Sequence, residues 1–254
     1  MSLSYGRIFA YVYNKKWTEY IEKVGPFILD FYSNKPISKK NKKVLDLCCG
    51  TGQLASLFLE NGYSVTGIDL SGDMLHYAKE NNKNYIEKSQ AEFIKGNAAD
   101  FSLKKKFGLV VSTYDSLNHL ENEKSLTKCF QTVYKVLAKN GYLIFDLNTR
   151  AGLKKNWRKK SFIDDEEMVI KIQGSFNIKE NKGSTSISGF IRKKDGSYEK
   201  FSEVIFNKCF EMDKVKKLLN KAKFQDIYFA KIEDLLNSIE NPEKENRVFI
   251  IAKK

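Results

Sequence analysis

The amino-acid sequence predicts an α/β protein with a doubly wound, mostly parallel sheet. Two observations lead to this prediction. Short apolar runs alternate with helical stretches between residues 43 and 148, and glycine turns or polar side chains follow the ends of these runs. Buried parallel strands have continuous apolar runs, and ligands bind beyond their carboxyl ends. The 254 residues, 42% of them hydrophobic, are enough for a buried core in one large domain or two smaller ones.

The first strand is predicted to end in a glycine turn that brings backbone close to a ligand. An apolar run within Lys43–Leu47 is followed by Gly50 and Gly52, and Gln53–Asn61 then has helical spacing. The free N–H groups at the start of such a helix point back toward the strand end. This geometry suits a nucleotide. With Ala55 the turn satisfies G-x-G-x-x-G/A, so a nicotinamide or flavin domain is one interpretation.

Asp46 favours another cofactor class. It lies on the strand four residues before Gly50, and D-x-x-x-G-x-G resembles the first motif of class I S-adenosylmethionine (SAM)-dependent methyltransferases. The resemblance implies that the loop, including Thr51 and Gly52, wraps the amino-acid end of SAM. It also implies that the Asp46 carboxylate reaches the ammonium group of SAM directly or through water. The alternative is that Asp46 only caps the following turn.

The second strand is predicted at Tyr63–Asp69. Asp69 lies at its carboxyl end, where a carboxylate can accept both hydroxyls of a ribose, in SAM or in NAD. The next residues resemble the methyltransferase segment in which Ser71 caps a helix and residues beside Asp69, such as Leu70, line the adenine. Met74 either faces the adenine or packs in the core.

The third strand, Glu92–Gly96, is followed by Asn97 and Ala98. Methyltransferases commonly have an aspartate after this glycine, which accepts the adenine N6 hydrogen. The amide oxygen of Asn97 can accept the same bond. Asp100 is the alternative acceptor, although it also suits a turn or a helix cap.

The fourth strand, Phe107–Thr113, leads into residues 114–120. In the family, this strand end supplies a backbone carbonyl for the SAM ammonium group, here near Ser112 and Thr113, and side chains that face the substrate. His119 is a candidate general base for an attacking nitrogen or oxygen, and Tyr114 is a second catalytic candidate. The alternative is that His119 caps or packs against the helix predicted at 121–139.

A β cap is predicted after the fifth strand, which is expected within residues 139–148. Alternating runs at Met168–Ile178, Thr185–Arg192 and Tyr198–Phe206 are joined by turn residues, including Asp195-Gly196, and predict three or four antiparallel strands. The aromatic-rich residues 1–36 predict either two helices packed on the sheet edge or a helical lid over a small-molecule pocket. Lid and cap together resemble bacterial small-molecule methyltransferases, including dimethylaminosugar N-methyltransferases. Related sequences often have a histidine on the last cap strand, and residues 203–208 have none.

The resemblance implies a seven-stranded Rossmann-like sheet whose strand seven is antiparallel. The last helix is expected at Phe210–Phe224 and the closing strands at Phe224–Ile232 and Arg247–Ala252. The predicted domains are an N-terminal helical lid (1–36), the first part of the SAM-binding core (37–149), the antiparallel β cap (150–207) and the rest of the core (208–254).

The composition limits the range of partners. The net charge is +13, but only five of the 44 basic residues are arginine, and the lysine runs suit solvated loops, so we expect no nucleic-acid partner. Four cysteines without C-x-x-C spacing predict neither a metal site nor a disulfide framework. No signal peptide and no long apolar stretch occur, so we expect a cytoplasmic protein with no membrane partner. A monomer and a homodimer are both open.

The predicted function is the SAM-dependent transfer of a methyl group to a small-molecule nitrogen or oxygen. A neutral amine acceptor would need no catalytic base. Alternatives are an RNA-associated methyltransferase, a non-catalytic SAM-binding module and, with least support, an NAD(P)-dependent oxidoreductase. The candidate substrate-facing residues are Tyr11, Tyr13, Tyr114, Asn118, His119 and Trp157.

Overall fold

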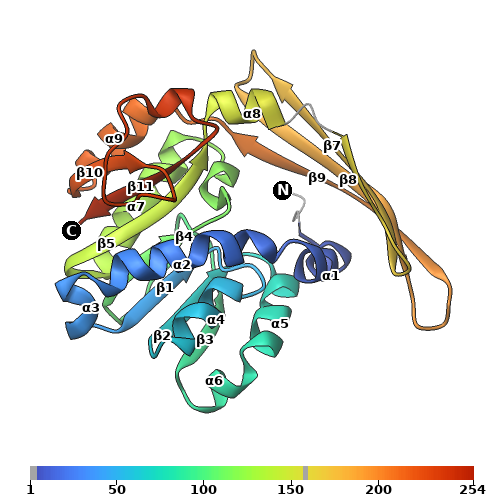
Figure 1. Ribbon diagram of the computed structural model, residues 1–254, viewed down its shortest axis with the longest axis horizontal. Helices are drawn as coiled ribbons and strands as arrows, with labels where there is room; N and C mark the ends of the chain where they lie inside the picture. Colours follow the sequence, from blue (N-terminus) through green and yellow to red (C-terminus); the bar gives the residue numbers. More distant parts are fainter. Residues whose placement is uncertain (1–4, 157–159) are drawn as a thin grey trace.

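The computed structural model describes residues 5–156 and 160–254. Figure 1 shows an α/β core, helices from the N-terminal segment and a long sheet that projects from the core. Trp157, one of the predicted substrate-facing residues, lies outside the described residues. The domain boundaries at 36, 149 and 207 stay predictions.

The core is a seven-stranded sheet in the order β10-β11-β5-β4-β1-β2-β3. Strands β1 to β5 pair in parallel, and β11 lies antiparallel between β5 and β10. The doubly wound sheet with its antiparallel strand beside strand five is therefore confirmed. The strands are β1 (Lys43–Leu47), β2 (Ser64–Asp69), β3 (Ala91–Lys95), β4 (Phe107–Ser112), β5 (Leu137–Asn148), β10 (Gln225–Ala230) and β11 (Arg247–Lys253).

Helices cover both faces of this sheet. Alternate residues of one strand enter opposite cores, since Val44 packs with α2 and α4 whereas Leu45 packs with α7 and α9. This double burial explains the continuous apolar runs in the sequence. The helices are α2 (Glu19–Ser33), α3 (Pro36–Lys40), α4 (Gln53–Glu60), α5 (Gly72–Asn81), α6 (Lys83–Glu87), α7 (Glu123–Val136), α8 (Arg150–Asn156) and α9 (Met212–Lys221), with 3₁₀ turns η1 (Ser116–His119) and η2 (Pro242–Lys244).

Two helix boundaries show how local residues position the site. Ser71 caps α5 by accepting a hydrogen bond from the Met74 N–H at 3.2 Å, as the sequence predicts. The prediction that the helix before strand five runs to residue 139 is wrong by one turn. α7 ends at Val136 because Leu137 already pairs with Phe107 in the sheet.

The projecting sheet is the predicted cap. It has four antiparallel strands in the order β6-β7-β8-β9. One face packs its apolar side chains, such as Ile170 and Ile187, against α1 (Arg7–Lys16) in a third core that also includes Phe9 and Met74. Helix α1 thus lies between the cap and α5. The cap strands are β6 (Lys160–Asp164), β7 (Met168–Asn177), β8 (Lys182–Arg192) and β9 (Tyr198–Lys208).

Among the described residues, we find no helix with the length and apolar character that a membrane crossing requires.

Candidate active site

A cavity of about 480 Å³ lies at the carboxyl ends of β2, β3 and β4, beneath the cap. Its wall combines α1, these strand ends, three cap strands and the start of β11. A volume of this size is typical of small-molecule sites. Among the predicted cofactor residues, those that line the cavity are Gly50, Asp69, Leu70, Met74, Asn97 and Ala98. The remaining predicted cofactor residues are buried and do not line the cavity: Asp46, Thr51, Gly52, Ser112 and Thr113.

Asp69 is held in place by backbone donors at the end of β2. Its Oδ2 accepts a hydrogen bond from the Gly50 N–H and its Oδ1 accepts one from the Ser71 N–H, each at 2.9 Å. Burial raises the pKa of Asp69, and these N–H groups oppose the shift. Each carboxylate oxygen keeps a free lone pair, so the side chain can accept the two hydroxyls of a ribose.

The glycine turn permits a close approach of backbone to ligand. Gly50 and Gly52 have φ values of 54° and 83°, which side chains with a Cβ rarely adopt. A Cβ on Gly52 would lie 2.8 Å from the Asn82 side chain and 3.1 Å from Ala78. The turn therefore requires glycine for both its conformation and its packing against α5.

Asp46 has a buried carboxylate oxygen without a partner. The residue is 3% exposed, and within the described part of the chain its Oδ2 accepts no hydrogen bond. Burial and the nearby Asp69 carboxylate raise the pKa of Asp46 to about 7. Buried polar atoms are normally hydrogen-bonded, so this oxygen indicates a missing donor. An ammonium group at the glycine turn, directly or through water, would supply it. The residues therefore fit SAM.

The end of β3 places Asn97 in the cavity wall and Asp100 outside it. Asn97 lines the cavity, but its Oδ1 already accepts the Ala99 N–H at 2.9 Å. The amide oxygen has a second lone pair for an adenine amino group. Asp100 is exposed and outside the cavity lining, so the alternative acceptor lies away from the site.

Two strained residues follow β4. Tyr114 and Asp115 have φ values of 62° and 50°, and both line the cavity. Left-handed conformations cost non-glycine residues about 1–3 kcal/mol each and occur often at functional sites. The Asp146 carboxylate accepts the Asp115 N–H at 3.2 Å, and the Tyr114 ring stacks on Tyr20 with centroids 4.3 Å apart. The strain is therefore supported by long-range contacts.

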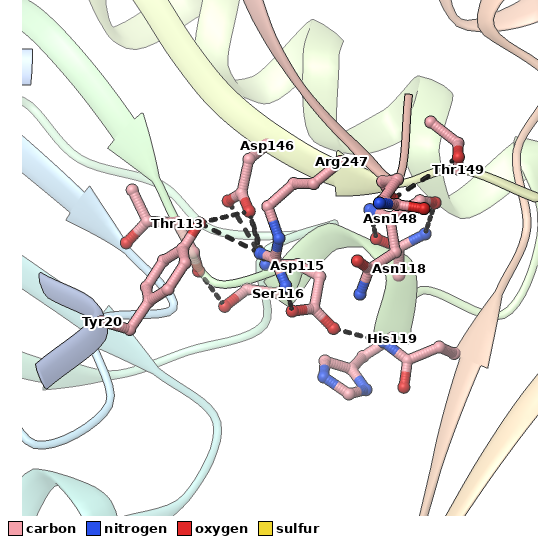
Figure 2. Close-up of polar contacts among 12 residues, drawn as sticks. Tyr20, Thr113, Asp115, Ser116, Asn118, His119, Asp146, Asn148, Thr149 and Arg247 are labelled. Carbon is pink, nitrogen blue, oxygen red and sulfur yellow. Dashed lines mark hydrogen bonds and ion pairs between the residues drawn. The ribbon is translucent and has the colours of Figure 1, made fainter. Parts of the chain in front are cut away.

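Arg247 joins these contacts into the network shown in Figure 2. Its guanidinium forms ion pairs with Asp146 and, at 2.6 Å, with Asp115. The Tyr20 hydroxyl donates to Asp146 at 2.9 Å, and the Asn207 amide from the cap donates to Asp115 at 2.6 Å. The carboxylates of Asp115 and Asp146 are thus contacted by side chains from the N-terminal helices, the cap and the closing strand β11.

The charges of this network do not cancel. Burial alone would lower the pKa of Arg247, but the Asp146 and Asp115 carboxylates outweigh it, so the pKa rises and the guanidinium stays charged. Burial raises the pKa of Asp146, although Arg247 opposes the shift. Two carboxylates share one guanidinium, and Asp69 lies in the same cavity wall. The wall therefore favours cationic ligands.

His119 also lines the cavity, in a defined tautomer. Its Nδ1 lies 2.8 Å from the Phe206 carbonyl oxygen, which can only accept, so Nδ1 donates. Its Nε2 then accepts the Tyr5 hydroxyl at 2.9 Å. Burial raises the pKa of Tyr5, with a further rise from Asp115, so this hydroxyl keeps its proton. In the neutral ring with its proton on Nδ1, Nε2 is therefore the acceptor nitrogen, and the Tyr5 hydroxyl occupies it.

The predicted substrate residues separate into two groups. Tyr13 and Tyr114 line the cavity together with His119. Asn118 is fully buried and holds the backbone of Asn148 and Lys208 through its amide, so it positions β5 and β9. Tyr11 lies outside the lining and donates to Glu167 at 3.3 Å.

Sequence reasoning missed several residues that line the cavity. Tyr5, Asp115 and Arg247 are polar examples, and the cap adds Ile172, Thr185, Ile187, Ile205 and Asn207. The alternating pattern of the cap strands predicts that they have two faces, but it does not predict which face lines the cavity.

Comparison with known proteins assigns a domain to the core. Residues 44–141 match the family model described as "Methyltransferase domain". A relative from Geobacillus sp. (strain WCH70), by name a candidate methyltransferase, is 29% identical over 214 residues, which are 84% of this chain and 85% of the relative.

Solved structures share the fold over nearly the whole chain. An S-adenosylmethionine-dependent methyltransferase from Clostridium acetobutylicum superimposes with a TM-score of 0.77 at 22% identity and 97% coverage of each chain. The sugar N-methyltransferase KedS8 from Streptoalloteichus sp. gives a TM-score of 0.72 at 15% identity, covering 100% of this chain and 94% of its own. Both confirm the predicted fold.

Proposed function

We propose that this chain, an enzyme with a SAM-dependent methyltransferase domain at residues 44–141, transfers the methyl group of SAM to an amine nitrogen of a small molecule. One observation carries the small-molecule acceptor: the cap residues Ile187, Ile205 and Asn207 line the same cavity as Asp69 and Asn97. An acceptor that reaches the methyl group must therefore fit beneath the cap. The volume of about 480 Å³ suits a small molecule beside the cofactor.

The charge of the cavity favours nitrogen over oxygen as the acceptor atom. The chain has a net charge of +13, yet Asp69 and Asp115 line the cavity against the single guanidinium of Arg247 among the described residues. Carboxylates and aromatic faces such as Tyr13 and Tyr114 bind ammonium groups. A structural neighbour, KedS8, is named a sugar N-methyltransferase, which supports the same atom.

Each part of the wall has a role in this reaction. When bound, SAM supplies a methyl group on a positively charged sulfur, which is already activated toward attack by an amine. Asp69 holds the ribose and Asp46 holds the ammonium group at the glycine turn. Asp115 receives the acceptor as an ammonium ion. Fixing both reactants in one cavity can contribute roughly 7–11 kcal/mol.

His119 is the proposed proton acceptor. Its Nδ1 is fixed by the Phe206 carbonyl, so Nε2 is the only basic nitrogen of the ring. Tyr5 now donates to that nitrogen. An ammonium group that displaces the Tyr5 hydroxyl could give its proton to Nε2 and become the neutral nucleophile. Tyr114, beside Asp115, is proposed to position the acceptor through its ring.

Methyl transfer between matched acceptors tests this function. The chain is incubated with methyl-labelled SAM and either an amino sugar or the same sugar with a hydroxyl in place of the amine, and products are measured by mass spectrometry. We expect label on the amine only. Label on the hydroxyl compound would contradict the proposed acceptor. So would label on RNA if, in a panel of such sugar pairs, neither sugar were labelled.

A further inference from the structure

The cap has a second face that the proposed function does not use. Strand residues alternate in direction, so the neighbours of the inward-facing Ile170 and Ile187 point away from the cavity. We call the side chains of β6 to β9 on this side the outer cap face. Pairing places Val169 beside Phe190, and Phe190 beside Lys200. Figure 1 shows that this sheet extends well beyond the core.

Aromatic rings are exposed on the outer cap face. Phe162, Phe190, Tyr198 and Phe206 are 66%, 46%, 59% and 47% exposed. They come from three different strands. Tyr198 lies diagonally across from Phe190, whereas Phe206 pairs with Ser184 farther along β8, and the Lys182 Nζ lies 3.8 Å from the centre of its ring. Large apolar side chains that share an exposed face indicate an interaction surface.

Positive charge accompanies these rings. The outer cap face carries one acidic residue, Asp164, and six basic residues: Lys160, Lys171, Lys182, Arg192, Lys200 and Lys208. Among the described residues, none of these six forms an ion pair with an acidic side chain. The acidic residues of β9, Glu199 and Glu203, point to the other side and bind the N-terminal segment. The sheet therefore separates its charges between two faces.

We propose that the outer cap face binds single-stranded nucleic acid. Exposed rings on a sheet can stack with bases, and lysines that form no ion pair can contact the phosphates between them. The sequence predicts no nucleic-acid partner from its few arginines and from lysine runs in loops, whereas the basic residues of this face lie on strands that also carry exposed aromatic rings. A second copy of the chain fits this face poorly, because it would bring six like charges against six.

Nucleic acid bound here would lie on the opposite side of the sheet from the cavity. The surface therefore acts as a docking site, and methyl transfer to a small amine continues without it. This separation allows the two functions to be tested independently.

Fluorescence anisotropy with labelled RNA and DNA single strands of about 16 nucleotides tests the proposal. The first variant combines Phe190→Ala with Tyr198→Ala, and the second combines Lys171→Glu with Lys200→Glu. The control combines Lys216→Glu with Lys217→Glu, which changes the net charge equally on the exposed side of α9. SAM affinity and thermal unfolding establish that each variant is folded.

We expect the aromatic variant to bind at least about tenfold more weakly. The lysine variant should also bind more weakly, with a salt slope reduced by about 0.7 for each lost phosphate contact, while the control stays within about twofold. RNA and DNA arms identify which strand is preferred. The proposal is overturned if the intact chain binds neither strand, or if the control weakens binding as much as the lysine variant. It is also overturned if the same variants instead abolish binding to anionic vesicles or dissociate a dimer.

Discussion

The two halves of the cavity are built in different ways. The cofactor half, at the ends of β1 to β3, is held by local backbone: Asp69 is fixed by N–H groups of Gly50 and Ser71. The acceptor half is held by side chains from distant segments, since Asp115 is fixed by Arg247 and Asn207. A locally held half depends on a short motif, whereas the other half depends on the complete fold. Mutations should therefore damage the two halves differently.

The largest expected effect is a loss of stability when Arg247, in the acceptor half, is replaced. Arg247→Met leaves the Asp115 and Asp146 carboxylates buried without their cation, and removing one partner of a buried ion pair costs about 3–5 kcal/mol. We expect the free energy of unfolding, measured in urea, to fall by this amount. Arg7→Met is the control, because Arg7 forms an exposed ion pair and should cost about 1 kcal/mol or less. Equal losses would show that the network does not support the fold.

A smaller effect is expected in the cofactor half. Asp69→Ala removes a charged acceptor, which should cost about 1.5–3 kcal/mol of SAM binding and leave the stability of the fold less affected. Calorimetry measures the affinity. Asp73→Ala is the matched control, because Asp73 is exposed on the next helix and outside the cavity lining. Unchanged affinity in Asp69→Ala would exclude Asp69 as the ribose ligand.

Asp46 should contribute most clearly to the pH dependence of the cofactor half, alongside Asp69, whose pKa burial also raises. The pKa of Asp46 in the folded chain is raised to about 7, above the ordinary value, so the folded state binds a proton that the unfolded state releases. The stability that this proton contributes is fully present below about pH 4 and is lost as the pH rises to about 7, by up to roughly 1.4 kcal/mol per pH unit. Urea unfolding across this range measures it, and Asp46→Asn should remove this component.

With SAM bound, Asp46 should favour its ionised form over its protonated form. The reason is that an ammonium group stabilises the ionised carboxylate. We therefore expect SAM affinity to increase with pH up to about 7, and Asp46→Asn to flatten the increase. The same pH profile in the variant would place the titrating group elsewhere.

The smallest expected effect on stability concerns the hydrogen bond between the Tyr5 hydroxyl and His119 Nε2. Tyr5→Phe removes the hydroxyl that binds Nε2 at 2.9 Å, which should cost about 0.5–1.5 kcal/mol of stability. Because the competing donor is gone, the concentration of amine at half-maximal rate should fall. Tyr11→Phe is the control, since Tyr11 lies outside the lining. A rise in that concentration would show that Tyr5 binds the acceptor and does not compete with it.

The same contrast explains how far the sequence could predict the structure. Strands, the glycine turn, Asp69 and the cap follow from periodicity and turn residues that lie close together in the chain. Asp115 was missed because nothing in its local sequence shows a left-handed backbone at a non-glycine residue. Arg247 and Tyr5 were missed because their partners lie in other segments, and a strand pattern does not identify a long-range ion pair.

Calorimetric titration of the intact chain with SAM and, separately, with NAD⁺ tests whether the cavity is a SAM site. We expect saturable heat with SAM, at a Kd well below millimolar, and none with NAD⁺. We also expect Asp69→Ala to weaken the SAM signal and Asp73→Ala to leave it unchanged. Binding of NAD⁺ without SAM heat would contradict the assignment of the cavity.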